Sequence, residues 1–275
     1  MKLDLLKSKF THDKSSNRIY LMHLHQDDFP GIIQHFDHLA QEYHYTKIFV
    51  KVATHYAPAF FSAGYSMEAF IPKFFYGEKD VVFLSKFLSS ERQIPEYEHL
   101  QAFQNMLLKS PLGTQKKPDP KYALRKLSLH DIQDMIRVFR KVFETYPFPI
   151  FETDFLEKSM QVDGTRYFGA FLDNQLVAVS SAECDEEGKN AEMTDFAVLP
   201  ECRGLGLAVH LLSCMEHALE KDNFKTFYTI SRLKSLPMNK TFYNANYSYA
   251  GTLIQNTQIS GSIESMNVWY KRVDG

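Results

Sequence analysis

A turn with two glycines lies between an apolar strand and an amphipathic helix in residues 194–208. The strand ends near Leu199, and Gly204 and Gly206 come before the helix. Glycine permits conformations in which successive amides face outward, and the start of a helix adds free N–H groups and a positive dipole end. Such a turn can bind a pyrophosphate. The dinucleotide pattern GxGxxG does not fit, because residue 209 is valine and hairpins replace the βαβ unit.

Hydrophobic periodicity predicts the elements that position this turn. Ser128 can cap the first helix, and the three strands before the turn are expected to form hairpins. The strand after the turn is reached by a crossover, so it should be parallel to the strand before it. These elements form a mixed α/β sheet with helices on both faces. The predicted helices are residues 132–143, 155–160, 207–219 and 238–245, and the predicted strands are residues 166–172, 175–183, 191–199, 226–231, 249–253 and 266–272.

Composition favours a small-molecule substrate. The chain has 275 residues, 44% of them hydrophobic, which is enough for one or two domains. Its 31 basic and 33 acidic side chains show no sustained basic run, so neither a nucleic acid nor a membrane is expected as a partner. The three cysteines lack metal-ligand spacing, and no signal peptide or apolar span is visible. We therefore expect a soluble, cytoplasmic protein without a metal.

The pattern Arg-x-x-Gly-x-Ala at residues 203–208, after a strand ending in Leu-Pro, resembles the acetyl-CoA loop of GNAT N-acetyltransferases. The order of elements over residues 122–273 resembles that family too. This resemblance implies the GNAT fold, whose mixed, mostly antiparallel sheet contains a splayed pair of parallel strands, and it implies acetyl-CoA as cosubstrate. The implied cofactor-binding residues are Phe196, Ala197 and Val198, whose strand edge would pair with the pantetheine arm, and Arg203, Gly204, Leu205, Gly206, Leu207 and Ala208, whose amides would hold the diphosphate.

Acetyl transfer to an amine needs a proton acceptor, because an alkyl amine with a pKa near ~10.4 is mostly protonated at neutral pH. The resemblance makes Glu192 the first choice for this base, with a solvated strand-end glutamate as the alternative. Asp195 is either a partner of the substrate ammonium or a buried hydrogen-bond anchor, and a bulge would decide which face it occupies. Many GNAT enzymes protonate the leaving thiolate with a tyrosine, but Phe242 stands at that position. Tyr243 would need an altered register, so we favour water as the proton donor.

Three further segments, residues 192–197, 251–257 and 263–271, resemble the beta-lysine N-acetyltransferase family. The resemblance to that family extends over the whole chain. This resemblance implies acetylation of the side-chain amine of beta-lysine, which yields a compatible solute. Such a substrate carries two ammonium groups and a carboxylate, so acidic and amide partners are expected. The candidate substrate-binding residues are Tyr146 and Phe148 in the loop after the first helix, together with Asn256, Glu264 and Asn267.

Two rival functions remain open from the sequence. One is a GNAT enzyme that acts on a polyamine, an aminoglycoside or a protein lysine. The other is a non-catalytic CoA-binding module, which Phe242 keeps in consideration. The oligomeric state is also undecided by the sequence, and a homodimer is one option.

The sequence predicts an N-terminal α/β region over residues 1–112, a linker over residues 113–121 and the acetyltransferase domain over residues 122–275. In the first region we expect strands over residues 18–24, 47–52 and 81–88. The segment 60–66 matches 242–248 at a constant offset, and each follows a strand. The N-terminal region is therefore interpreted as half a GNAT fold, with a chance likeness as the alternative. It lacks a glycine turn, so its expected role is to complete the acceptor pocket or to form an interface.

Overall fold

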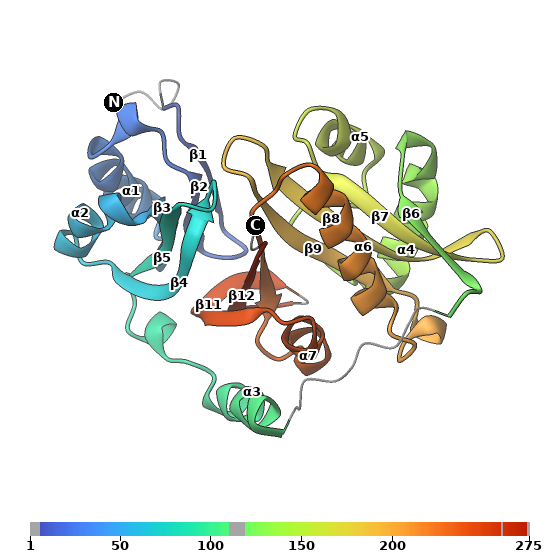
Figure 1. Ribbon diagram of the computed structural model, residues 1–275. Helices are drawn as coiled ribbons and strands as arrows, with labels where there is room; N and C mark the ends of the chain where they lie inside the picture. The colour runs from blue at the N-terminus through green and yellow to red at the C-terminus, as the bar shows by residue number, and fades with distance from the viewer. Residues whose placement is uncertain (1–5, 110–118, 260, 274–275) are drawn as a thin grey trace.

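The computed structural model describes residues 6–109, 119–259 and 261–273. Its strands form one twelve-stranded sheet in the order β1-β2-β3-β5-β4-β11-β12-β10-β9-β8-β7-β6 (Figure 1). The strands are β1 Lys9–Asp13, β2 Arg18–His23, β3 Lys47–Ala53, β4 Ser66–Phe75, β5 Lys79–Phe87, β6 Tyr122–Lys126, β7 Arg166–Leu172, β8 Gln175–Asp185, β9 Asn190–Val198, β10 Thr226–Arg232, β11 Ser248–Ile259 and β12 Ser262–Arg272. The α-helices are α1 Gly31–Tyr43, α2 Ala57–Ser62, α3 Tyr97–Lys109, α4 Ile132–Val142, α5 Thr153–Gln161, α6 Leu207–Lys221 and α7 Leu236–Asn244. In the described ranges no helix combines the length and apolarity that a membrane span needs.

The predicted hairpins β7-β8 and β8-β9 are present, and β10 is parallel to β9, as expected from the crossover. Ser128 and Asp131 form a capping box just before α4. The apolar side chains of α6 recur at helical spacing and are buried, among them Leu211, Met215 and Leu219. Helix α6 covers one face of β8 and β9, and α4 covers the opposite face (Figure 1). The mixed sheet with helices on both faces is therefore confirmed.

Strands β9 and β10 pair over a short stretch only. Their register runs from Asn190 opposite Thr226 to Glu192 opposite Tyr228, and then the two strands separate. The pairing of β9 with β8 shifts register between Val179 and Ser181, which marks a bulge in β9. The separation leaves the edge of β9 from Phe196 to Val198 unpaired with β10, as expected for a splayed parallel pair.

The sheet order reads symmetrically outward from the junction of β4 and β11. On one side it continues through β5 and β3 to β2, and on the other through β12 and β10 to β9. The inner parallel pairs also correspond, because β2 is parallel to β3 as β9 is to β10. Figure 1 shows the N-terminal strands on one side, β6 to β9 on the other, and β11 and β12 between them. The N-terminal region thus repeats the order of the C-terminal elements.

The matching segments 60–66 and 242–248 also have the same local structure. The backbone amide of Tyr65 donates to the carbonyl of Phe60, and that of Tyr247 donates to the carbonyl of Phe242, both at 3.1 Å. In each segment the residue before this tyrosine is left-handed, with φ 88° at Gly64 and 65° at the corresponding asparagine. Each tyrosine ring packs edge-on against its phenylalanine, at 5.1 and 5.2 Å. The sequence likeness therefore reflects a shared helix ending.

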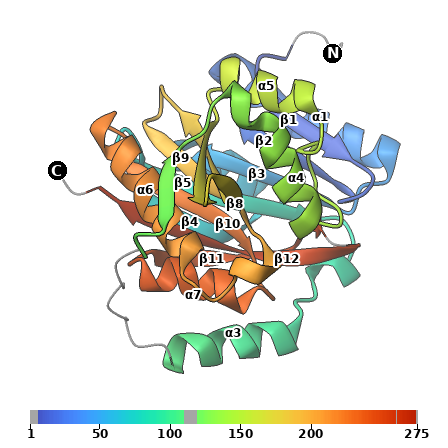
Figure 2. The same ribbon diagram turned by 90° about the vertical axis from the view of Figure 1, so that its right-hand side faces the viewer.

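Helix α3 carries the N-terminal region across to the C-terminal elements. It lies beside α7 in both views (Figures 1 and 2). Its buried Phe103 packs edge-on against Trp269, with ring centroids 5.8 Å apart. Trp269 is 1% exposed and donates to the side chain of Asn239, so it is part of the core.

Several elements differ from the expected pattern. The sequence did not suggest β1, β4 or β6, and the strand expected at residues 249–253 extends through Ile259 as β11. The last N-terminal helix, α3, begins at Tyr97, after a short 3-10 turn that follows β5. The predicted linker, residues 113–121, lies outside the described residues as far as residue 118.

Candidate active site

The glycine turn has the backbone conformation that the sequence suggests. Gly204 and Gly206 both have φ of 77°, and Gly206 is the N-cap of α6. No side chain caps this helix, so its first amides are free to meet a ligand. A Cβ added at Gly204 would have no heavy atom within 4 Å, so the space beside it is open. The side chain of Arg203 turns back, and its Nε donates to the carbonyl of Val198 at 3.3 Å.

A cavity of about 1200 Å³ opens where β9 and β10 separate. Of the predicted cofactor-binding residues, most line it: Phe196, Val198, Arg203, Gly204, Gly206, Leu207 and Ala208. Two do not, because Ala197 is fully buried in the core and the side chain of Leu205 is half exposed on the surface. Their backbones remain part of the strand edge and the loop.

The bulge in β9 places Asp195 on the cavity wall. This residue is left-handed, with φ of 54°, and lines the cavity together with Glu192. In a regular strand, positions 192 and 195 would face opposite sides. Met193 and Ala197 point instead into the core. The bulge therefore gives one face of β9 both carboxylates.

Asp195 is held by two hydroxyl groups. Tyr146 donates to its Oδ1 and Ser181 donates to its Oδ2, each at 2.5 Å. Burial raises the pKa of Asp195, while these two hydrogen bonds oppose the shift. Such hydrogen bonds fit a buried anchor, which is one of the two roles expected for Asp195. Tyr146 and Phe148 both line the cavity, where the sequence placed an acceptor wall.

Glu192 lies opposite Glu183 in the pairing of β8 with β9, and both side chains line the cavity. The side chain of Glu183 is exposed to the cavity. Desolvation by the surrounding protein, followed by the charges of Glu192 and Asp195, raises its pKa to about 8. Burial is also the main reason why the pKa of Glu192 is raised. Two carboxylates on adjacent strands cannot both ionise cheaply, so this wall can take up a proton near neutral pH.

A lysine from the N-terminal region reaches the same wall. Lys51 on β3 donates to the hydroxyl of Tyr228 at 2.8 Å, and Tyr228 is close enough to Glu192 to lower the pKa of that carboxyl. Burial lowers the pKa of Lys51, and the charge of Glu192 opposes that shift. Lys51, Tyr20, Met22 and Phe49 all line the cavity, so the N-terminal region forms part of its wall.

Tyr243 on α7, the alternative to water as the proton donor, does not line the cavity. Tyr243 packs instead against Trp269, with ring centroids 6.2 Å apart. Phe242 does line the cavity, edge-on to Phe196 at 5.6 Å. The register of α7 is therefore the one that the sequence suggested, with a phenylalanine at the position of the usual tyrosine.

Only one of the three polar residues expected near the acceptor from the last two strands reaches the cavity. Asn256 lines it and is 1% exposed. Glu264 is held by salt bridges to Arg232 at 2.7 Å and Lys234 at 2.9 Å. Asn267 donates to Asn239 at 2.8 Å within the buried interior. Neither of the latter two lines the cavity, because these ion pairs and hydrogen bonds hold them elsewhere.

Among the polar residues of this site that sequence reasoning missed are Arg18, Lys51, Glu183 and Tyr228. The hairpin register between β8 and β9 could have identified Glu183, since it faces Glu192. A basic residue in a largely apolar strand, as in β2 and β3, was a second usable signal.

Comparison with known proteins adds three findings. The model of a family described as "Acetyltransferase (GNAT) family" matches residues 129–242. The chain is 36% identical over 257 residues to the beta-lysine N(6)-acetyltransferase of Methanococcus maripaludis, covering 93% of each chain. It is 29% identical over 234 residues to the N-acetyltransferase YodP of Bacillus subtilis, covering 85% of each. Among solved structures, the Escherichia coli ribosomal-protein-S18-alanine N-acetyltransferase has 13% identity and a TM-score of 0.49, over 56% of this chain and 95% of that one.

Proposed function

This chain belongs to the acetyltransferase (GNAT) family, and we propose that it transfers the acetyl group of acetyl-CoA to the side-chain amine of beta-lysine. One observation carries the proposal: the paired carboxylates of Glu183 and Glu192 line the same cavity as the glycine turn before α6. An acidic wall attracts an ammonium group, and a carboxylate with a raised pKa can accept its proton.

The glycine turn suits a diphosphate. The amides of residues 203–208 surround the start of α6, where the helix dipole favours negative charge. The left-handed glycines at 204 and 206 keep this approach free of side chains. The unpaired edge of β9 from Phe196 to Val198 offers backbone groups to the pantetheine arm. Acetyl-CoA would supply the thioester that is attacked.

Glu192 is the residue that we assign as proton acceptor. Tyr228 lies close to it at the wall, and Lys51 beyond Tyr228 supplies a nearby positive charge. Asp195 acts by positioning Tyr146 and Ser181. Because Phe242 cannot donate a proton and Tyr243 lies away from the cavity, water would protonate the departing thiolate.

The choice of beta-lysine rests on the relatives and on the shape of the cavity. The relative from Methanococcus maripaludis carries that substrate in its name. The cavity is closed on one side by N-terminal residues, which include Tyr20 and Phe49. A closed wall favours a small amino acid over a long peptide.

An acceptor panel tests the proposal. Purified chain and acetyl-CoA would be incubated with beta-lysine, L-lysine, spermidine, an aminoglycoside and a lysine peptide, and thiol release would be followed. We expect the highest kcat/KM for beta-lysine. If spermidine, the aminoglycoside or the peptide gave a higher kcat/KM than beta-lysine, that acceptor would be assigned as the substrate instead. Acetyl-CoA binding without thiol release for any acceptor would favour a non-catalytic module.

A further inference from the structure

A buried arginine forms part of the cavity wall contributed by the N-terminal region. Arg18 on β2 is 8% exposed and lines the cavity. One terminal nitrogen donates to the hydroxyl of Thr257 at 3.0 Å, while its Nε has no hydrogen-bond partner within the part of the chain that the structure describes. Its guanidinium lies over the rings of Tyr20 and Phe49, at 5.2 and 5.8 Å from their centroids. A buried donor without an acceptor is costly unless a ligand satisfies it.

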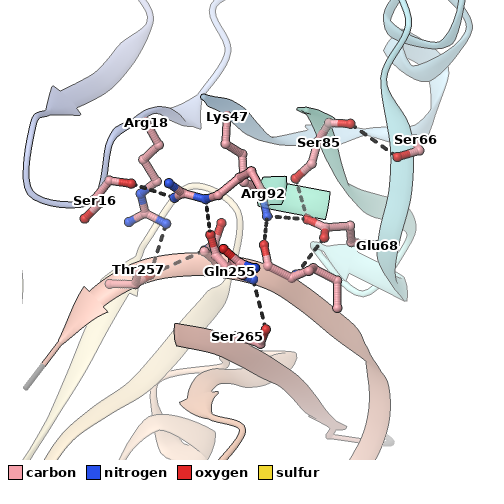
Figure 3. Close-up of polar contacts among 12 residues, drawn as sticks. Ser16, Arg18, Lys47, Ser66, Glu68, Ser85, Arg92, Gln255, Thr257 and Ser265 are labelled. Carbon is pink, nitrogen blue, oxygen red and sulfur yellow. Dashed lines mark hydrogen bonds and ion pairs between the residues drawn. The ribbon is translucent and has the colours of Figure 1, made fainter. Parts of the chain in front are cut away.

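The charges around Arg18 leave an excess of positive charge. Figure 3 shows Arg18 close to Lys47 and Arg92, at the junction of β2 and β3 with β11. Glu68 forms a salt bridge with Lys47 at 2.9 Å. Arg92 instead donates to neutral acceptors, the carbonyls of Gln255 and Ser16 and the hydroxyl of Thr46. Burial, followed by the charge of Arg18, lowers the pKa of Arg92 to about 10. Two guanidiniums and Lys47 thus share this region with two carboxylates, Glu68, which is already paired, and Asp13, whose charge acts on both guanidiniums.

An amide with a free acceptor lies next to this region. Asn256 on β11 donates to Thr257 at 3.4 Å, the same hydroxyl that accepts from Arg18. Its Oδ1 is buried and has no partner among the described residues. Both residues line the cavity, so a free N–H donor and a free carbonyl acceptor are available to the same ligand. An amino acid end presents the matching groups, a carboxylate and an ammonium.

We propose that Arg18 binds the carboxylate of the acceptor substrate and that the Oδ1 of Asn256 accepts a hydrogen bond from its adjacent ammonium. Tyr20, whose ring centroid lies 5.2 Å from the Arg18 guanidinium, lines the same cavity as Glu192, and the charges of both Glu192 and Arg18 act on its hydroxyl. A diamino acid held at one end by Arg18 and Asn256 would extend its other amine toward Glu192. The N-terminal region would then select amino acids over simple amines. This inference rests on the proposed function and names its specificity site.

The test compares substrates that differ only at the carboxylate. Beta-lysine and its carboxamide, 3,6-diaminohexanamide, keep the same chain and both amines. For the wild-type chain we expect a kcat/KM for beta-lysine at least about 30-fold above that for the amide, as for loss of one partner of a buried charge pair. Arg18→Gln should bring this ratio close to one. Lys86→Gln is the matched control, because it removes an N-terminal cation that pairs with Asp37 on α1, and it should keep the wild-type ratio.

A second pair of substrates tests Asn256. 6-Aminohexanoate lacks the ammonium next to the carboxylate, so Asn256→Leu should reduce kcat/KM for beta-lysine but not for 6-aminohexanoate. Equal turnover of beta-lysine and its amide by the wild-type chain would overturn the inference without any variant. So would an Arg18→Gln ratio equal to that of wild type. Acetylation of other amines with none of beta-lysine would contradict the proposed function, and the carboxylate site with it.

Discussion

Glu183 on β8 lies directly opposite Glu192 on β9, and both side chains line the cavity that begins at the glycine turn. Side chains at such paired positions are neighbours on one face of the sheet. Their mutual repulsion and their enclosure favour a shared proton, which is why the pKa of Glu183 is raised to about 8. The pair can therefore accept a proton from an ammonium in the pH range where enzymes usually work.

The pH dependence of kcat/KM should report this pair. A carboxyl group with a raised pKa stays protonated, and so cannot act as a base, until the pH approaches that pKa. We therefore expect kcat/KM for beta-lysine to rise as the pH passes about 8. Glu183→Gln removes the neighbouring charge and should move this rise to lower pH. Glu186→Gln, on the exposed turn after β8, is the control and should leave the rise in place. A profile unchanged by Glu183→Gln would count against coupling.

Replacement of Glu192 separates catalysis from cofactor binding. If Glu192 is the proton acceptor, Glu192→Gln should lower kcat by about 10² to 10⁴-fold. The affinity for acetyl-CoA, measured by calorimetry, should stay close to that of wild type, because Glu192 lies at the far end of β9 from the glycine turn. The loss should shrink at high pH, where more of the amine is already neutral. A rise in KM alone, without rescue by pH, would assign Glu192 to ammonium binding.

The glycine turn can be tested with two substitutions of nearly equal shape. Gly206 has φ of 77°, so any side chain is strained there, although asparagine and aspartate tolerate this conformation best. Gly206→Asp should weaken acetyl-CoA binding far more than Gly206→Asn, because only the carboxylate repels the diphosphate. Calorimetry with both folded variants decides. Equal affinities of the two variants for acetyl-CoA would show that charge repulsion at this turn does not weaken binding.

The junction between the two halves of the sheet depends on a buried ion pair. Lys47 is fully buried, and Glu68 accepts from it and from the backbone amide of Ile254 on β11. Glu68→Gln should lower the free energy of unfolding by about 3 to 5 kcal/mol, since it leaves a buried lysine unpaired. Asp37→Asn, which breaks a partly exposed pair with Lys86, should cost only about 0 to 1 kcal/mol. Denaturant unfolding of both variants measures the difference.

The same pair predicts a dependence of stability on pH. Burial lowers the pKa of Lys47 to about 8, below its value of 10.5 in an unfolded chain. Unfolding therefore takes up a proton between these two values, and stability should rise with pH in that range. The loss of unfolding free energy caused by Glu68→Gln should be smaller above about pH 8 than below it, because a neutral Lys47 gains little from a neighbouring carboxylate. A deficit that grows with pH would contradict this assignment.

The sequence predicted the glycine turn, the hairpins and the parallel crossover, because each follows from local spacing. It did not predict the placement of Asp195, since the bulge that turns it toward the cavity depends on pairing with β8. Glu264 was misplaced for a similar reason, because its partners Arg232 and Lys234 come from a distant segment. Polar residues on a strand have no visible partner until the sheet order is known.

The N-terminal part of the site was the least predictable. Arg18 and Lys51 lie on strands whose neighbours are far away in sequence, and Thr257, the partner of Arg18, is 239 residues along the chain. Among the described residues, strand pairing joins the two halves of the sheet at one register position, Gly251 opposite Ala69. A half-repeat in the sequence suggested that these strands exist, but it carried no signal for how they close the cavity.

The position of the acetyl group in the product tests the central claim most directly. Beta-lysine has two amines, and the proposed orientation puts the side-chain amine at Glu192 and the other amine at Asn256. Two-dimensional NMR of the product formed from acetyl-CoA and beta-lysine identifies the acetylated nitrogen. We predict that the acetyl group is on the side-chain amine alone. Acetylation of the amine next to the carboxylate, or no acetylated product at all, would contradict the account.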